Sequence, residues 1–247
     1  MDDLTPVERH GDLWLKRDDL YERAGIRGGK VRICWHLAQG APALTAASAR
    51  KSPQQQIVAR IAAALGIPCR IHTASGPPTA EQQDAAAHGA ELEFHRPGYN
   101  GVLVARARAY AAVSGAREIP FGMLHPDAVG ITRPQTANVP DDARRIVMAV
   151  GVGMAAAGIL WGLRDRGLEI PVVGVSVGAR PEKHMDRYAP PDWRRQMRIV
   201  QSHYDYATEV HESVGGVSLD PIYEAKCVEL LKPGDLFWII GCRPKPK

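Results

Sequence analysis

Short apolar runs alternate with helix-like runs along most of this chain, and this alternation limits its possible folds more than any other feature. Strand-like composition occurs at residues 12–16, 43–47, 67–73, 91–95, 145–150, 171–177 and 236–240. Helix-like composition occurs at residues 30–39, 53–65, 79–88, 101–113, 154–166 and 221–231. This order predicts a parallel sheet covered by helices, which is the arrangement of the α/β class.

The helix expected at residues 53–65 has clear signals at both ends. Ser52 is a favourable N-cap, and Pro53 suits the first helical position because no intrahelical hydrogen bond is lost there. Gly66 predicts the end of this helix. Residues 121–140 show no clear period and are expected to form a connection, while residues 178–216 are poorly specified.

An uncharged stretch at residues 146–163 raises the question of a membrane span. It contains several glycines, among them Gly151 and Gly158, so a buried strand, a tight turn and a small-residue helix describe it better. The formal net charge is +4, and the basic residues are spread along the chain. A nucleic-acid partner is therefore permitted, but nothing in the sequence indicates one.

The cysteines and histidines give no pattern of a metal centre. The four cysteines are far apart without a CxxC pair, which argues against both a zinc site and a disulfide framework. Metal-ligand spacing is also absent among four histidines, which are His125, His184, His203 and His211. No metal site is therefore expected. The first residues lack the basic and apolar regions of a secretory signal, so we expect a cytoplasmic protein with reduced thiols.

The turn at residues 150–158 joins an apolar strand to a helix of small residues. Such a turn directs backbone N–H groups and the positive end of a helix dipole at an anion, and phosphate is the expected ligand. A tight turn without a ligand is the alternative. Gly151, Gly153 and Ala156 also fit a dinucleotide pattern, but the following strand has no acidic residue near its end before Glu182, which disfavours that ligand.

Lys30 follows two glycines at the start of a predicted helix. A lysine enclosed by protein is driven towards its neutral amine form, which is a nucleophile. Taken alone, a solvated surface lysine is the more common outcome, because lysines are seldom buried.

Five segments in this order resemble the fold-type II pyridoxal-phosphate enzymes, within them the branch of D-cysteine desulfhydrase and 1-aminocyclopropane-1-carboxylate deaminase. They are residues 5–6 with 15–20, residues 28–32, residues 52–54 with 59–66, residues 151–158 and residues 219–226. The resemblance implies two parallel-sheet α/β domains with the cofactor between them. A large cofactor-binding domain is expected at residues 1–40 and 120–247, and a small substrate-loop domain at residues 41–119.

The resemblance also implies roles for individual residues. Lys30 is expected to hold pyridoxal phosphate as a Schiff base and to act in catalysis with Ser52 and Tyr223. Ser52, Gln54 and Gln55 are expected to bind the substrate. The cofactor contacts expected besides Lys30 are Gly151, Val152, Gly153, Met154, Ala155, Ala156 and Cys242. The implied function is a homodimeric lyase or deaminase that acts on a small amino acid through an α-carbanion.

The sequence departs from the family pattern at cofactor positions. Gly29 occupies the position before the lysine where the family pattern has asparagine. Pro53 occupies the position of the asparagine that is expected to contact the ring oxygen of the cofactor. Gly215 replaces the acid expected to face the pyridine nitrogen, which leaves Glu212 or Cys242 for that role. The chain is also shorter at residues 178–216 and 75–81, which predicts a more open site or one completed by a second subunit.

Other functions remain open at this point. Racemisation or decarboxylation is the second class of reaction, and it uses the same cofactor chemistry as the lyase or deaminase. The third class is a protein that binds the cofactor without turning over a substrate. The shortened cover also admits an amino acid attached to a larger carrier, such as modified DNA, although no basic stripe with interleaved aromatic residues supports it.

Overall fold

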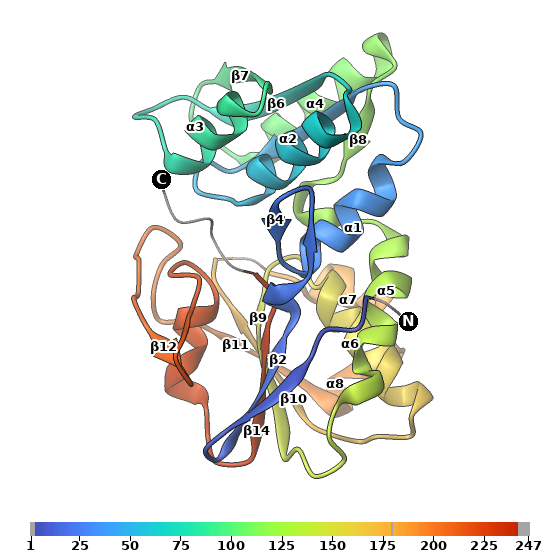
Figure 1. The fold of residues 1–247 in the computed structure, drawn as a ribbon, viewed down its shortest axis with the longest axis vertical. Helices are drawn as coiled ribbons and strands as arrows, with labels where there is room; N and C mark the ends of the chain where they lie inside the picture. Colours follow the sequence, from blue (N-terminus) through green and yellow to red (C-terminus); the bar gives the residue numbers. More distant parts are fainter. Residues whose placement is uncertain (1–2, 179, 242–247) are drawn as a thin grey trace. The chain divides into compact units, whose positions relative to one another are not determined.

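The computed structural model describes residues 3–178 and 180–241, which divide into two compact units. The first unit comprises residues 3–21, 27–29 and 125–241 apart from residue 179, and the second comprises residues 22–26 and 30–124. Each unit has its own mainly parallel sheet, and Figure 1 labels the elements. The predicted α/β class is confirmed. Helix residues 30–38 belong to the second unit, whereas the sequence grouped residues 30–40 with the large domain.

The sheet of the first unit has six strands in the order β1-β2-β14-β9-β10-β11. They are β1 (Val7–His10), β2 (Leu13–Arg17), β9 (Arg145–Val150), β10 (Val172–Ser176), β11 (Met197–Gln201) and β14 (Asp235–Ile239). All neighbours are parallel except β1 and β2. The chain leaves β9 for β10 on one side, while β14 lies on the other, so the strand order reverses between β9 and β14.

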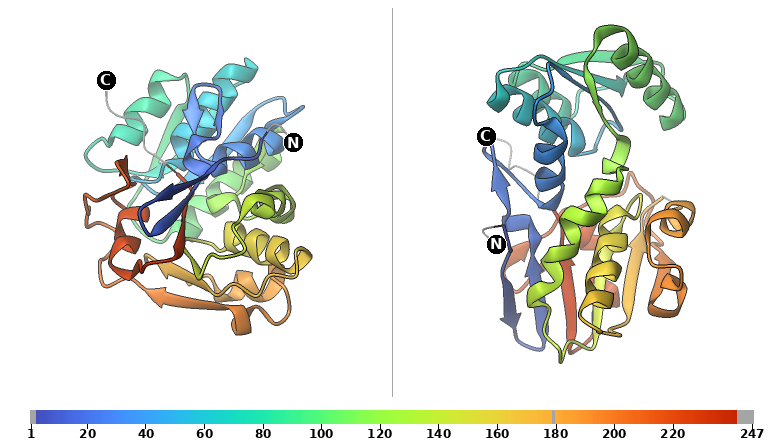
Figure 2. Two further views of the ribbon diagram at one scale, coloured as in Figure 1. Left: turned by 60° about the horizontal axis from the view of Figure 1, so that its bottom comes forward. Right: turned by 90° about the vertical axis from the view of Figure 1, so that its right-hand side faces the viewer.

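Helices and loops cover both faces of this sheet. Ile146 and Met148 of β9 pack in a core with apolar residues of α6, α7 and α8, and Figure 2 shows α6 alongside the strands. Val147 and Ala149 point to the opposite face, as the pleat requires, and pack against residues 210–231. The helical segments are η1 (Asp18–Leu20), α5 (Pro126–Thr132), η3 (Arg133–Asn138), α6 (Met154–Asp165), α7 (Glu182–Tyr188), α8 (Trp193–Gln196) and η4 (Glu224–Leu230).

The second unit has a fully parallel sheet of four strands in the order β7-β6-β5-β8. They are β5 (Leu44–Ser48), β6 (Cys69–Ala74), β7 (Glu91–His95) and β8 (Arg117–Ile119). The helical segments are α1 (Gly29–Ala38), α2 (Gln54–Leu65), α3 (Ala80–Ala87), α4 (Asn100–Ser114) and η2 (Phe121–Met123).

The structure also contains two short two-stranded ribbons. One pairs β3 (Glu22–Arg23) with β4 (Ile26–Arg27). The other belongs to the first unit and pairs β12 (Ser213–Val214) with β13 (Val217–Ser218).

Helix α2 ends at the predicted residue, and Gly66 follows it in the left-handed conformation with φ of 67°. Its N-terminus differs by one residue from the expectation, because Pro53 rather than Ser52 occupies the N-cap position. The Ser52 hydroxyl still accepts the backbone N–H of Gln54 at 3.3 Å, which satisfies one donor of the first turn.

Two stretches contain more regular structure than the sequence predicts. Residues 121–140 include α5, and residues 178–216 include α7, α8 and the edge strand β11. Helices α7 and α8 have seven and four residues and are too short to show a helical period, which explains why the sequence does not predict them. The helix expected at residues 221–231 is the shorter 3-10 segment η4, because Asp220 Oδ1 accepts the N–H groups of Ile222 and Tyr223 and holds a turn there.

The uncharged stretch at residues 146–163 forms β9, a turn and part of α6, as predicted. Among the helices of the described residues, none combines the length and the apolar character that crossing a membrane requires. Cys34, Cys69 and Cys227 are buried free thiols, and Cys242 lies outside the described residues.

Replacing Gly162 with alanine is expected to destabilise the protein by about 1–3 kcal/mol, the usual cost of overpacking a core. A Cβ atom at Gly162 would overlap the Thr136 hydroxyl and the Arg133 carbonyl oxygen, where η3 crosses α6. Gly130 in α5 is the matched control, because nothing lies within 4 Å of a Cβ atom there. Gly130→Ala is expected to be neutral or to stabilise by up to about 1 kcal/mol. Urea unfolding midpoints of the two variants check this, and equal midpoints would contradict it.

Candidate functional site

The carboxyl ends of the parallel strands bring several predicted segments of the first unit to one edge of its sheet. Strand β9 ends directly before Gly151, and β14 ends directly before Ile240. Ligands of open α/β sheets bind outside this edge, at the point where the strand order reverses. Since the order reverses between β9 and β14, the loops after these two strands form the candidate site of this unit.

The glycine-rich turn after β9 has the geometry that an anion requires. Gly153 has φ of 92°, and a Cβ atom there would lie 2.8 Å from Met185 Sδ, so only glycine fits. A Cβ atom at Gly151 would meet nothing within 4 Å, which shows open space beside the turn. The first turn of α6 presents N–H groups without intrahelical partners, at the positive end of the helix dipole. The backbone of residues 151–156 therefore fits a phosphate group.

The backbone before Lys30 is fixed to the end of β14. The N–H of Gly29 donates to the carbonyl oxygen of Ile240 at 2.7 Å. A Cβ atom at Gly29 would lie 2.5 Å from Asp18 Oδ2, so the buried Asp18 carboxylate fills the space of a side chain. This close approach gives a physical reason for glycine where the resemblance leads to an expectation of asparagine. Lys30 is the next residue in the chain and is partly buried.

Glu224 is a buried carboxylate at this edge that the sequence reasoning missed. Its side chain is 3% exposed, and Oε1 accepts the N–H groups of Ile240 at 3.3 Å and Gly241 at 3.2 Å. Its position directly after Tyr223, inside the segment of residues 219–226, was the signal for it in the sequence. Glu212, which the sequence offered for the acidic role, is exposed, and Cys242 lies outside the described residues.

Tyr223 has a second tyrosine as its neighbour. The hydroxyl groups of Tyr223 and Tyr206 lie 3.4 Å apart, and the two rings meet edge to face. Both side chains are partly buried. Asp220 fixes the backbone of Tyr223 by accepting its N–H at 3.1 Å. Tyr206 was missed because no motif surrounds it in the poorly specified stretch of residues 178–216.

The predicted substrate-binding residues lie at the start of α2 in the second unit. The Gln54 side chain donates to Pro120 O at 3.0 Å and accepts from Gly122 N at 2.7 Å, so it holds the loop after β8. The Gln55 side chain donates to Arg50 O at 2.6 Å, and its Oε1 is buried without a hydrogen-bond partner among the described residues. Of the two amides, Gln55 is the one with unused hydrogen-bonding capacity.

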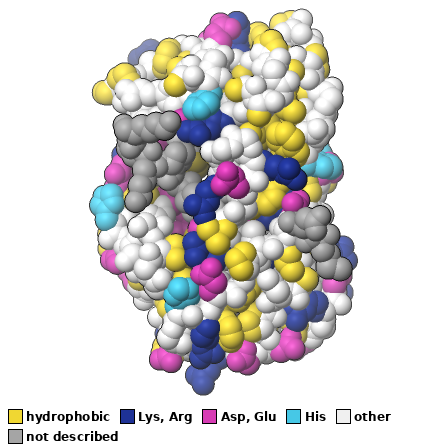
Figure 3. All heavy atoms as spheres, viewed as in Figure 1, with side chains coloured by type: hydrophobic (Ala, Val, Ile, Leu, Met, Phe, Trp, Pro, Cys, Tyr) yellow, Lys and Arg dark blue, Asp and Glu magenta, His cyan; other side chains and the backbone are white. Residues whose placement is uncertain are grey.

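The predicted site residues divide between the two units. The glycine-rich turn and Tyr223 belong to the first unit, and Lys30, Ser52, Gln54 and Gln55 belong to the second. On the face drawn in Figure 3, basic and acidic side chains are interspersed. That face shows no stripe of one sign that would suit a nucleic-acid backbone.

Comparison with known proteins adds a family and a fold. The model of a family described as "Pyridoxal-phosphate dependent enzyme" matches residues 4–226. Comparison with curated protein sequences gives no match. Similar solved structures include an ACC deaminase homologue, with a TM-score of 0.80, 21% identity and coverage of 96% of this chain and 89% of the other.

Two other similar structures are a deaminase and a synthase. The processed form of threonine deaminase isoform 2 from Solanum lycopersicum has a TM-score of 0.67 and 14% identity, covering 99% of this chain and 86% of the other. An O-ureido-L-serine synthase has a TM-score of 0.65 and 16% identity, covering 96% and 88%. At these identities the similarity establishes the shared fold.

Replacing Glu224 with leucine is expected to lower the free energy of unfolding by about 1–3 kcal/mol, because the N–H groups of Ile240 and Gly241 lose their acceptor. Glu224→Gln keeps an amide oxygen at this position and is expected to lose less stability. Denaturant unfolding of both variants measures the difference. A leucine variant as stable as the glutamine variant would show that the two hydrogen bonds contribute little.

Proposed function

Because this chain belongs to the family of pyridoxal-phosphate dependent enzymes, we propose that it is a lyase or deaminase acting on a small amino acid. The observation that carries the proposal is the glycine-rich turn at the point where the strand order reverses, beside a backbone tether that leads directly into Lys30. The similar structures named as an ACC deaminase homologue and as a threonine deaminase support this class of reaction.

The residues of the chain are suited to hold the cofactor. In this proposal the backbone N–H groups of residues 151–156 bind the phosphate, and the Lys30 amine carries the cofactor through a covalent bond. We assign the pyridine nitrogen to Glu224, which supersedes the guesses Glu212 and Cys242. Two observations support this assignment: Glu224 is buried, whereas Glu212 is exposed, and its carboxylate lies at the carboxyl end of β14.

The other proposed roles concern the substrate. When bound, the cofactor supplies an electron sink for negative charge at the substrate α-carbon. Lys30 would serve as the general base that takes the proton from that carbon. Tyr223 serves as a second acid or base, and the Tyr206 hydroxyl at 3.4 Å supports this by orienting the phenol. Ser52, Gln55 and the first N–H groups of α2 bind the substrate carboxylate.

The proposed assembly rests on the resemblance alone. We propose a homodimer in the cytoplasm with a small amino acid as substrate. Sedimentation velocity of the purified chain tests the dimer. Racemisation remains the alternative outcome of the same chemistry, since it also begins with removal of the α-proton.

Lys30→Ala is expected to abolish the visible absorption band that lysine-bound pyridoxal phosphate produces in the purified protein, because no amine remains at that position to bond the cofactor. The matched control is Lys183→Ala, which changes an exposed lysine on α7 and should keep the band. Spectra of the three proteins after incubation with the cofactor and removal of its excess give the answer. A band that persists in Lys30→Ala would place the covalent bond on another lysine.

The reaction class is tested by measuring ammonia released from a panel of small D- and L-amino acids by the cofactor-loaded protein. Release from at least one amino acid, lost in Lys30→Ala and kept in Lys183→Ala, is expected. Chiral analysis of the same mixtures detects racemisation. An intact visible band without ammonia release from any member of the panel would contradict the lyase or deaminase assignment while leaving the cofactor assignment in place.

Gly153→Ala is expected to weaken retention of the cofactor about tenfold, because a non-glycine residue in the left-handed region costs about 1–2 kcal/mol. The Cβ atom of the new alanine would also press on the side chain of Met185, which lies on α7 beside the glycine-rich turn. Gly167→Ala is the matched control, because Gly167 is also left-handed, with φ of 66°, but lies beyond the opposite end of α6, where its Cβ atom would meet nothing within 4 Å. Dialysis followed by measurement of bound cofactor compares the two variants. Equal loss from both would show that the strained position does not shape the phosphate site.

A further inference from the structure

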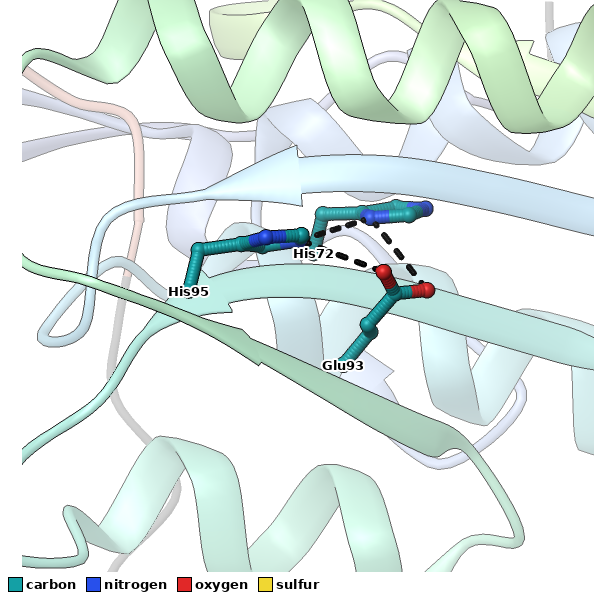
Figure 4. A group of neighbouring side chains, drawn as sticks. All are labelled: His72, Glu93 and His95. Atoms are coloured by element: carbon teal, nitrogen blue, oxygen red, sulfur yellow. Dashed lines mark hydrogen bonds and ion pairs between the residues drawn. The ribbon is translucent and has the colours of Figure 1, made fainter.

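Three potential metal ligands converge on the sheet of the second unit, and none of them has a role in the proposed reaction. His72 lies on β6, and Glu93 and His95 lie on the edge strand β7. The parallel register pairs His72 with Glu93, and alternate residues of β7 share a face, so all three side chains lie on one side of the sheet. Figure 4 shows them pointing toward one another.

The spacing of the three groups suits a single ion. His72 Nδ1 lies 3.0 Å from His95 Nε2 and 3.7 Å from Glu93 Oε2, and His95 Nε2 lies 3.6 Å from Glu93 Oε1. Tetrahedral zinc with bonds of about 2.0–2.1 Å places its ligand atoms about 3.3–3.4 Å apart. The observed separations bracket this value, so small movements of the side chains would bring all three to bonding distance.

The group combines a buried ligand with a route for an ion from solvent. The His72 side chain is only 2% exposed. The side chains of His95 and Glu93 are 15% and 41% exposed, so an ion can reach the group from solvent. Two imidazole nitrogens and one carboxylate oxygen leave a fourth position of a tetrahedral site open.

The two ring nitrogens of His72 have different surroundings. Its Nδ1 faces another imidazole nitrogen, and between two neutral rings only one of these atoms can carry a proton. Its Nε2 is buried and has no hydrogen-bond partner among the described residues. An ion at Nδ1 would replace the histidine–histidine contact with metal bonds from both rings, and Nε2 of His72 would then carry the ring proton.

The nearest cation is held by another partner. Arg70 makes a two-pronged ion pair with Glu91, at 2.6 Å and 3.0 Å, and lies over the ring of Tyr110. Its distance to Glu93 is longer, at 3.4 Å. Arg70 therefore keeps its own carboxylate when Glu93 turns toward an ion.

We propose that His72, Glu93 and His95 bind one divalent transition-metal ion, with Zn²⁺ as the best match to two nitrogen ligands and one oxygen ligand. The ion joins the edge strand β7 to β6 and stabilises the second unit. This site is separate in its chemistry from the cofactor and does not depend on the proposed reaction.

The test uses untagged, cofactor-loaded protein that has been treated with a chelator and transferred to phosphate-free buffer. Zn²⁺ is added, unbound ion is removed by gel filtration, and the bound metal is measured per chain, with affinity from competition with a chromogenic chelator. The variants are His95→Ala and the conservative Glu93→Gln. The matched controls are His88→Ala, a histidine that bonds its own helix backbone, and Glu118→Gln on the opposite edge strand β8.

One Zn²⁺ per chain is expected for the unaltered protein and both controls. Each ligand variant should weaken binding by more than the roughly 10–100-fold that loss of an outer-shell partner costs. Zn²⁺ should also raise the thermal unfolding midpoint of the unaltered protein but not of His95→Ala. Binding that survives in both ligand variants, or no retained Zn²⁺ in the unaltered protein, would overturn the proposal.

Discussion

The end of strand β14 is the point on which the candidate site depends. The carbonyl oxygen of Ile240 accepts the N–H of Gly29, and the N–H groups of Ile240 and Gly241 donate to Glu224. A short backbone segment thus joins the residue before Lys30 to the segment that contains Tyr223. Glu224 is buried, and Ile240 and Gly241 are partly buried, so a lost partner leaves a donor or an acceptor poorly satisfied. The ordinary pairing of a sheet edge therefore also positions residues for chemistry.

Close approach explains the glycines at the site better than flexibility does. Asp18 occupies the space beside Gly29, and Met185 occupies the space beside Gly153. A side chain at either position would press on a buried neighbour, and at Gly153 it would also strain the left-handed backbone. The departure at Gly29 is thus coupled to Asp18, and the two positions are best regarded as one unit of packing.

Much of the fold could be predicted because its central elements have strong local patterns. Strand β9 and the glycine-rich turn are indicated by an apolar run followed by small residues, and Lys30 is indicated by its two preceding glycines. Helices α7 and α8 were missed because they are too short to show a period.

The missed site residues share a different cause. Glu224, Tyr206 and the group around His72 acquire their neighbours through tertiary structure, in which strand register or the packing of loops links residues far apart in the sequence. Spacing along the chain carries no trace of such pairing unless a motif preserves it. The resemblance supplied that information for the segment of residues 219–226, and nothing supplied it for β6 and β7.

The interrupted first unit has a consequence for how the chain folds. Strand β2 pairs with β14, so residues near the start of the sequence must wait for residues near its end. Residues 30–124 of the second unit are continuous, and its four strands can assemble as soon as that stretch has left the ribosome. Strand β14 is among the last segments to be made, and β9 cannot pair with it before then. Folding of the nascent chain is thus expected to proceed from the inserted unit outward, with the candidate site of the first unit completed by the final strand.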